Sequence, residues 1–191
     1  MIPFVDIHTH LKTDAVTILT VGVHPWLAGE GVLPTTEEIA SAEAIGEIGL
    51  DKASAVNFGL QMVQFQAQLR LAEQYEKPVV LHGVRAYEEV LKALDEVQLP
   101  AVIFHGFIGS TALTARLLKR GCYLSFCERT FRSSKTLEAL RSTPLERLFI
   151  ETDESPMPLV EIYEKVAEVK GITCEELQQA TYENYLKLFR K

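Results

Sequence analysis

Histidine is the residue whose placement in this sequence first indicates chemistry. The chain has five histidines, each at or just after the C-terminal end of a short apolar run: His8, His10, His24, His82 and His105. Two acids share this placement, Glu47 in EAIGEIGLD and Asp153 in FIETDESP. In parallel α/β folds, ligands bind outside the carboxyl ends of the strands. We therefore expect these seven side chains to converge on one face of the protein.

Each of these residues has an ordinary structural explanation when it is taken alone. His8 and His10 would share one face of an extended segment, but such a pair also arises by chance. His82 and His105 each follow a strand and could be hydrogen-bonded structural histidines, and Asp153 could cap a helix. None of these explanations accounts for the absence of histidine from every predicted helix. A joint role in binding metal explains the whole set.

The mixture of ligand types limits which metals could bind and how many ions the site could hold. Imidazole and carboxylate together suit zinc, manganese, iron or nickel, whereas carboxylates alone favour magnesium or calcium. Four histidines and two carboxylates exceed the three protein ligands of a mononuclear catalytic zinc. They suffice for two ions about 3.5–4 Å apart if one carboxylate bridges them, and Glu47 is our candidate bridge. We expect one or two divalent ions, with zinc, manganese, magnesium, iron and nickel as candidates.

The elements that must position these side chains are short strands alternating with helices. Seven apolar runs predict buried parallel strands: Pro3–Ile7, Thr17–Val23, Ala44–Ile48, Pro78–Leu81, Ala101–Phe104, Cys122–Phe126 and Arg147–Ile150. One helix is predicted from a stripe at helical spacing, formed by Phe58, Met62, Phe65, Leu69 and Ala72. Thr35-x-x-Glu38 and Thr173-x-x-Glu176 are typical of capping boxes that open two more. The pattern predicts an α/β fold with a parallel sheet, open or closed into a barrel.

The first βα unit departs from this pattern. Only about ten residues separate the first two runs, fewer than a helical crossover between parallel strands needs. Seven strands are therefore predicted rather than eight. Either the first unit has lost its helix or the barrel is incomplete.

Length, composition and charge limit the domain count, the substrates and the location that we expect. The 191 residues suit one domain, 1–191, with a sizeable core. The net charge of −7 disfavours a broad nucleic-acid-wrapping surface, but bound cations could still attract a polyanionic substrate. No apolar run is long enough to cross a membrane, and the N-terminus lacks the features of a signal peptide. The expected location is cytoplasmic, with no membrane partner, and the oligomeric state is left open.

Several short motifs, in order along the chain, together resemble one family. They are Asp6-Ile-His8-Thr-His10-Leu11, Gly22-Val-His24-Pro25, Gly46-Glu47-Ile-Gly49-Leu50-Asp51, Leu81-His82 with Arg85, His105-Gly-Phe107 and Glu151-Thr-Asp153. This set is similar to the TatD family of metal-dependent deoxyribonucleases over residues 4 to about 156, with a weaker match over 183–189. The combination of GEIGLD with the HxH and ETD segments is specific.

The resemblance implies a fold and a set of roles. The fold would be a distorted TIM-like (β/α) barrel of the amidohydrolase type. One metal would be bound by His8, His10, Glu47 and Asp153, and the second by Glu47, His82 and His105. Asp153 would also deprotonate the attacking water, and His24 would contact substrate or support a ligand.

The sequence also departs from the family pattern around the predicted pocket. The chain is shortened between His10 and Gly46. The segments His82-Gly-Val-Arg85, His105-Gly-Phe-Ile-Gly-Ser110 and Phe126-Cys-Glu-Arg129 differ from what is usual there. The ligands are intact, so these departures affect only the identity of the substrate.

The main functional hypothesis is metal-assisted hydrolysis of a phosphodiester, at a DNA end, with catalysis by Asp153 and Glu47. Three arginines follow strand ends and could bind phosphates, with Arg85 as the main candidate and Arg129 and Arg132 as weaker ones. For each of the three, a solvated surface charge is the alternative. A second hypothesis is hydrolysis of a small phosphoester, amide, lactone or aminoacyl ester by the same site. A third, non-catalytic metal binding, is disfavoured because a structural site rarely needs an open position and a base.

Overall fold

The computed structural model describes residues 2–190, and within them six strands alternate with helices. The chain forms two compact units. One is Ile18–Phe104, called the central unit below, and the other joins the residues up to Thr17 with those from His105 onward, called the terminal unit. That the chain is one domain stays a prediction.

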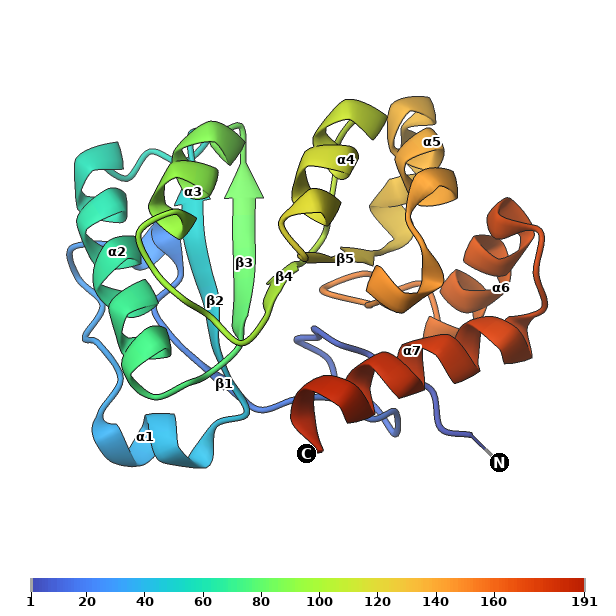
Figure 1. Ribbon diagram of the computed structural model, residues 1–191, viewed down its shortest axis with the longest axis horizontal. Helices are drawn as coiled ribbons and strands as arrows, with labels where there is room; N and C mark the ends of the chain where they lie inside the picture. Colours follow the sequence, from blue (N-terminus) through green and yellow to red (C-terminus); the bar gives the residue numbers. More distant parts are fainter. Residues whose placement is uncertain (1, 191) are drawn as a thin grey trace. The chain divides into compact units, whose positions relative to one another are not determined.

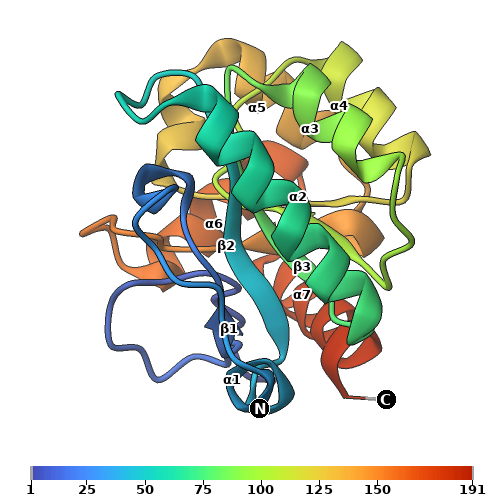
Figure 2. The same cartoon turned by 90° about the vertical axis from the view of Figure 1, so that its left-hand side faces the viewer.

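The central unit is a parallel sheet covered by helices. Its strands are β1 (Thr20–Val21), β2 (Ala44–Asp51), β3 (Val79–Val84) and β4 (Val102–Phe104), which pair in that order, all in parallel. The helices are η1 (Pro25–Leu27, a 3-10 turn), α1 (Thr36–Ser41), α2 (Phe58–Gln74) and α3 (Tyr87–Leu94). Both α2 and α3 pack against the sheet (Figure 1), and α2 lies over β2 and β3 in Figure 2.

Polar side chains help to hold α2 on the sheet. Phe65, Leu69 and Ala72 are buried, as the predicted stripe requires, but Phe58 and Met62 are only half-buried. Gln61 and Gln68 are buried in addition. Their amides hydrogen-bond the backbone of the segments that α2 covers, so α2 is joined to the sheet by polar contacts as well as apolar ones.

The terminal unit is built from the rest of the chain. Its strands β5 (Tyr123–Phe126) and β6 (Leu148–Ile150) pair in parallel. Its α-helices are α4 (Thr111–Lys119), α5 (Ser134–Ser142), α6 (Leu159–Lys170) and α7 (Cys174–Phe189), with 3-10 turns η2 (Glu128–Arg132) and η3 (Leu145–Arg147). Each of α4, α5 and α6 packs on the next α-helix along the chain, and α7 also packs on β6 (Figure 1).

Six of the seven predicted runs contain strands, and the first does not. Pro3–Ile7 forms only an isolated bridge, Val5 with Val16, and Ile7 N–H donates to the Ile150 carbonyl at 3.1 Å. The hydroxyl of Tyr163 donates to the Val5 carbonyl at 2.8 Å and fixes this segment from α6. A few separate hydrogen bonds thus replace a continuous ladder, which accounts for a count of six strands instead of seven.

Both predicted capping boxes are present. Thr35 and Glu38 exchange hydrogen bonds at the start of α1, and Thr173 and Glu176 do so at the start of α7. Over residues 2–190, no helix is both long enough and apolar enough to cross a membrane.

Candidate metal site

The HxH segment and Asp153 are brought together by backbone pairing in the terminal unit. Asp153 N–H donates to the His8 carbonyl, and His10 N–H donates to the Asp153 carbonyl, each at 3.0 Å. This pairing places Oδ1 of Asp153 3.8 Å from His8 Nε2 and 3.7 Å from His10 Nε2. Such distances are too long for hydrogen bonds. They are close to the spacing of about 3.4 Å between ligands of a tetrahedral zinc, so the three atoms fit a shared cation.

Asp153 is also bound by an arginine. Nη2 of Arg129 donates to Oδ2 of Asp153 at 2.6 Å, so the two carboxylate oxygens face different partners. Gly106, at φ 51°, makes room for this guanidinium, because a Cβ there would lie 2.7 Å from Nη2. Arg129 therefore lies at the candidate site. Arg132 instead pairs with Glu128, one turn away on the surface, as a solvated charge would.

His105 lies beside the same residues and is supported by a buried acid. Its ring centroid is 4.4 Å from that of His8, and its Nδ1 lies 3.3 Å from Oε1 of Glu151. Burial raises the pKa of Glu151, but His105 and His8 more than offset this effect, so the pKa is lowered overall. Glu151 is therefore a carboxylate that can orient the His105 ring. We call His8, His10, His105 and Asp153 the terminal cluster.

A second buried acid supports the backbone next to Asp153. Asp6 accepts hydrogen bonds from Thr152, at 2.9 Å from the backbone N–H and 2.7 Å from the hydroxyl. Burial, partly offset by these bonds, raises the pKa of Asp6 to about 6. Asp6 thus links the HxH segment to the ETD segment through Thr152.

Glu47, His82 and His24 meet in the central unit and form what we call the central cluster. Glu47 is on β2 and His82 on the neighbouring β3, while His24 precedes η1. Oε1 of Glu47 lies 2.7 Å from Nδ1 of His82 and 3.3 Å from Nε2 of His24. The three residues can offer ligand atoms within 4.8 Å of one another.

Close packing of β2 on β3 depends on Gly49. This residue has φ 149°, and a Cβ there would overlap the carbonyl oxygen of His82. Glycine is therefore required at this point of the GEIGLD motif, and it keeps His82 in register with β2.

His82 lies between two carboxylates. Its Nδ1 faces Glu47, and its Nε2 faces Oδ2 of Asp51 at 3.1 Å. A neutral imidazole has one N–H and can satisfy only one of these acceptors. At 2.7 Å, Nδ1 and Glu47 are within hydrogen-bond distance of each other. A metal ion bound by both would require these two atoms to move apart, and Nε2–H would then donate to Asp51 in the carboxylate–histidine–metal arrangement found at many sites. The donor set of the central cluster therefore fits a divalent cation.

Asp51 is itself held firmly. Oδ2 also accepts from the indole Nε1–H of Trp26 at 2.7 Å, and Oδ1 accepts from the Ala53 N–H at 2.7 Å. Burial raises the pKa of Asp51, but hydrogen bonds from Trp26, His82 and Ala53 outweigh it, so the pKa is lowered overall. Asp51 is a stable carboxylate partner for His82.

His24 differs from His82 in how its ring nitrogens are used. Its Nδ1 accepts the backbone N–H of Trp26 at 3.1 Å, so in the neutral ring the proton lies on Nε2, which faces Glu47. His24 is thereby arranged to orient Glu47. This contact is compatible with the predicted supporting or substrate-binding role, which stays a prediction.

Arg85 follows β3 on the exposed surface. Its φ of 54° is unusual for a residue other than glycine. Its predicted contact with substrate stays a prediction.

Each unit thus gathers part of the predicted ligand set, and the six-ligand binuclear site with a bridging Glu47 stays a prediction. Reasoning from the sequence gave no role to Asp6, Asp51, Glu151 or Trp26. Three of these are acids within or beside the motifs DIHTH, GEIGLD and ETD, and their position in the motifs was the available signal. Trp26 directly follows His24-Pro25, and nothing in the spacing marked it.

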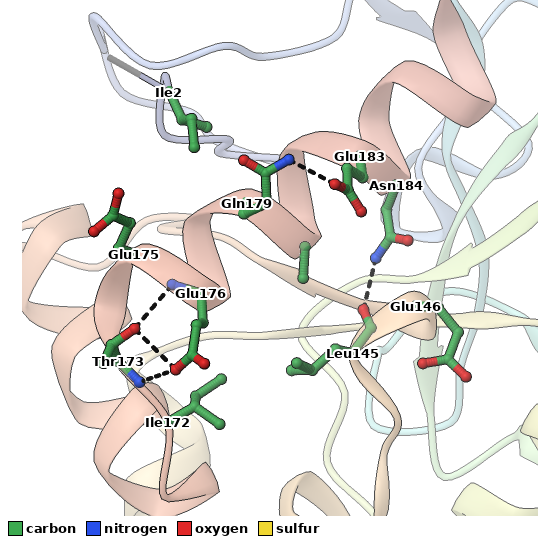
Figure 3. Close-up of a pocket in the computed structure, with 11 residues that line it drawn as sticks. Ile2, Leu145, Glu146, Ile172, Thr173, Glu175, Glu176, Gln179, Glu183 and Asn184 are labelled. Carbon is green, nitrogen blue, oxygen red and sulfur yellow. Dashed lines mark hydrogen bonds between the residues drawn. The ribbon is translucent and has the colours of Figure 1, made fainter.

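A surface pocket of the terminal unit is not part of this chemistry. It lies along α7 (Figure 3), and Glu146, Glu175, Glu176 and Glu183 are among its lining residues. No residue of the terminal cluster lines it. Its acidic lining would repel phosphate, so it is a poor candidate for a phosphodiester.

Comparisons of the sequence with a family model and with known proteins indicate the same family. The family model described as TatD related DNase matches residues 5–190. An uncharacterized metal-dependent hydrolase, YabD of Bacillus subtilis, is 33% identical over 194 residues, covering 89% of this chain and 76% of YabD. The 3'-5' ssDNA/RNA exonuclease TatD of Citrobacter rodentium is 33% identical over 202 residues, with the same two coverages, 89% and 76%.

Solved structures agree in fold. The Escherichia coli TatD homologue YjjV matches with a TM-score of 0.85 at 23% identity, covering 100% of both chains. A TatD family hydrolase from Entamoeba histolytica matches with a TM-score of 0.78 at 20% identity, covering 93% of this chain and 76% of the other. These similarities confirm the predicted fold class, an α/β fold of the TIM-like (β/α) type.

Proposed function

The chain belongs to the TatD-related DNase family of metal-dependent hydrolases, and we propose that it hydrolyses phosphodiester bonds at the ends of nucleic-acid strands. The observation that supports this proposal is the presence of two histidine–carboxylate clusters, in each of which ligand atoms lie within 4.8 Å of one another. The exonuclease named among its relatives supports the choice of substrate.

We propose that the metal ligands are those predicted from the sequence. In the terminal unit, His8, His10 and Asp153 would bind one divalent ion, with His105 beside them. In the central unit, Glu47 and His82 would bind a cation. A bound divalent ion supplies Lewis acidity and lowers the pKa of water towards about 7.

The residues of the chain then have distinct tasks. Asp153 would accept the proton of the attacking water, because its oxygens keep lone pairs beyond their contacts to the histidines and to Arg129. When substrate binds, the half-exposed Arg129 guanidinium would contact a phosphate oxygen as well as Asp153. Arg85, exposed at the end of β3, would contact a further phosphate.

The test is an exonuclease assay on metal-loaded protein. Single-stranded oligonucleotides labelled at either end, and bis(p-nitrophenyl) phosphate as a minimal diester, are compared for wild type, Asp153→Asn and Arg132→Ala. We expect stepwise shortening of the oligonucleotides by wild type and Arg132→Ala, and a loss of at least about 100-fold in Asp153→Asn.

Two results would contradict this proposal. Failure to hydrolyse either diester under any metal would exclude phosphodiester chemistry. Hydrolysis of the small diester alone, without dependence on salt, would instead favour the second hypothesis, a small ester substrate, because contacts with several phosphates weaken as salt rises.

A further inference from the structure

The one tryptophan of the chain lies beside the central cluster, and more than half of the residue is exposed. Trp26 is 59% exposed although its indole N–H donates to the buried Asp51 carboxylate. Since the polar edge of the indole is engaged, the exposed part is the carbon surface of the ring.

Trp26 differs from an ordinary exposed apolar residue in being held in place. Besides the bond to Asp51, its backbone N–H donates to His24 Nδ1. Its ring lies edge-to-face with the rings of His24 and His82, at centroid distances of 4.7 and 6.0 Å. Single exposed apolar side chains are common and need no function. An indole held by its own hydrogen bond to Asp51, on a backbone held by His24, is pre-organised to receive a flat partner.

We propose that Trp26 is a stacking platform for a nucleobase, belonging to the nucleotide whose phosphate is held at the central cluster. This inference rests on the function proposed above and specifies its substrate class as single-stranded nucleic acid. Every base has a π-face, so stacking on a tryptophan tolerates any sequence. A base within a duplex is already stacked and paired, and it becomes available only in single strands or frayed ends.

The neighbouring residue provides a matched control. Leu27 follows Trp26 in η1 and is 56% exposed, but it has no flat ring. A surface that binds through general apolar contact would depend on both residues. A nucleobase platform depends on Trp26 and not on Leu27.

The experiment measures binding of two labelled oligomers to the metal-loaded protein. One is an oligothymidylate with phosphorothioate linkages, which resist hydrolysis, and the other is an abasic oligomer of the same length and linkages. Fluorescence anisotropy gives the affinity for wild type, Trp26→Ala, Trp26→Phe and Leu27→Ala. Because the chain has one tryptophan, quenching of the wild-type intrinsic fluorescence reports directly on this ring.

We expect Trp26→Ala to bind the oligothymidylate about 5- to 100-fold more weakly than wild type. Trp26→Phe should recover most of this loss, although it also lacks the N–H bonded to Asp51, because it keeps a ring. The abasic oligomer should bind wild type and Trp26→Ala alike, without quenching, and Leu27→Ala should match wild type with both oligomers.

Three outcomes would overturn the assignment. They are equal thymidylate binding by wild type and Trp26→Ala, equal losses for the thymidylate and abasic oligomers, and no binding of thymidylate by wild type. Turnover of bis(p-nitrophenyl) phosphate by wild type, measured in parallel, tests the proposed hydrolase activity separately, since that substrate requires no base platform.

Discussion

Replacing Asp51 by asparagine should weaken metal binding at the central cluster while preserving the shape of the side chain. Asp51 is 3% exposed, and its carboxylate accepts hydrogen bonds on both oxygens. Oδ1 faces the N–H groups of Ala53 and Ser54, and Oδ2 faces the Trp26 indole N–H and His82 Nε2. An asparagine has one oxygen, so in either orientation its NH₂ group meets donors where an acceptor stood.

The size of the effect follows from the role of Asp51 behind His82. Loss of a carboxylate that orients a metal-bound histidine costs about 10- to 100-fold in metal affinity. This range corresponds to about 1.4–2.7 kcal/mol. Folding stability should fall as well, because a buried donor that loses its partner costs about 1–3 kcal/mol.

The assay is a competition titration with a chromophoric chelator, carried out on Asp51→Asn, wild type and Glu89→Gln. Glu89 is the matched control, because it is a carboxylate of the same unit that pairs with Lys52 and not with the cluster. We expect the affinity to fall in Asp51→Asn alone. Wild-type affinity in a folded Asp51→Asn protein would refute the orienting role that we assign to Asp51.

Three further predictions concern folding. Tyr163→Phe should lower the free energy of unfolding by about 1–3 kcal/mol, because the buried backbone of Val5 loses its hydroxyl partner; an unchanged urea midpoint would contradict this. Hydrogen bonds from Thr173 lower the pKa of Glu176 below its ordinary 4.5. Wild type should therefore have a higher free energy of unfolding in urea than Glu176→Gln, by an amount that is constant above pH 4.5 and shrinks as the pH falls through the lowered pKa. A stability difference between wild type and Glu176→Gln that grows as the pH falls would contradict this prediction. Gly49→Ala should lower the melting temperature sharply, since its Cβ would overlap a backbone carbonyl; a wild-type melting temperature would show that β2 can shift.

The sequence predicted the elements that depend on local patterns. Six apolar runs contain strands because buried parallel strands are apolar on both faces, and the capping boxes at Thr35 and Thr173 need only residues three apart. The run Pro3–Ile7 has the same composition, but whether it forms a ladder depends on partners far along the chain, which its own residues do not specify.

The sequence indicated which residues to consider as metal ligands, an assignment that stays a prediction, but it did not indicate which residues support them. Histidines that all lie at strand ends stand out in a sequence, because a structural role for each one alone does not explain their joint placement. The support of His82 by Asp51 requires knowing that β2 and β3 are neighbours in a given register. The buried Gln61 and Gln68 were missed for a similar reason, since an amide that binds distant backbone resembles any polar residue on a helix.

The most direct test of the account is the metal content of purified wild type and Glu47→Ala by mass spectrometry, with oligonucleotide hydrolysis measured on the same samples. We predict divalent metal in wild type, a reduced content in Glu47→Ala, and a parallel loss of hydrolysis. Wild-type protein that takes up no divalent metal after reconstitution, or a Glu47→Ala protein with unchanged metal content and turnover, would contradict the central claim that this histidine–carboxylate constellation is a catalytic metal site.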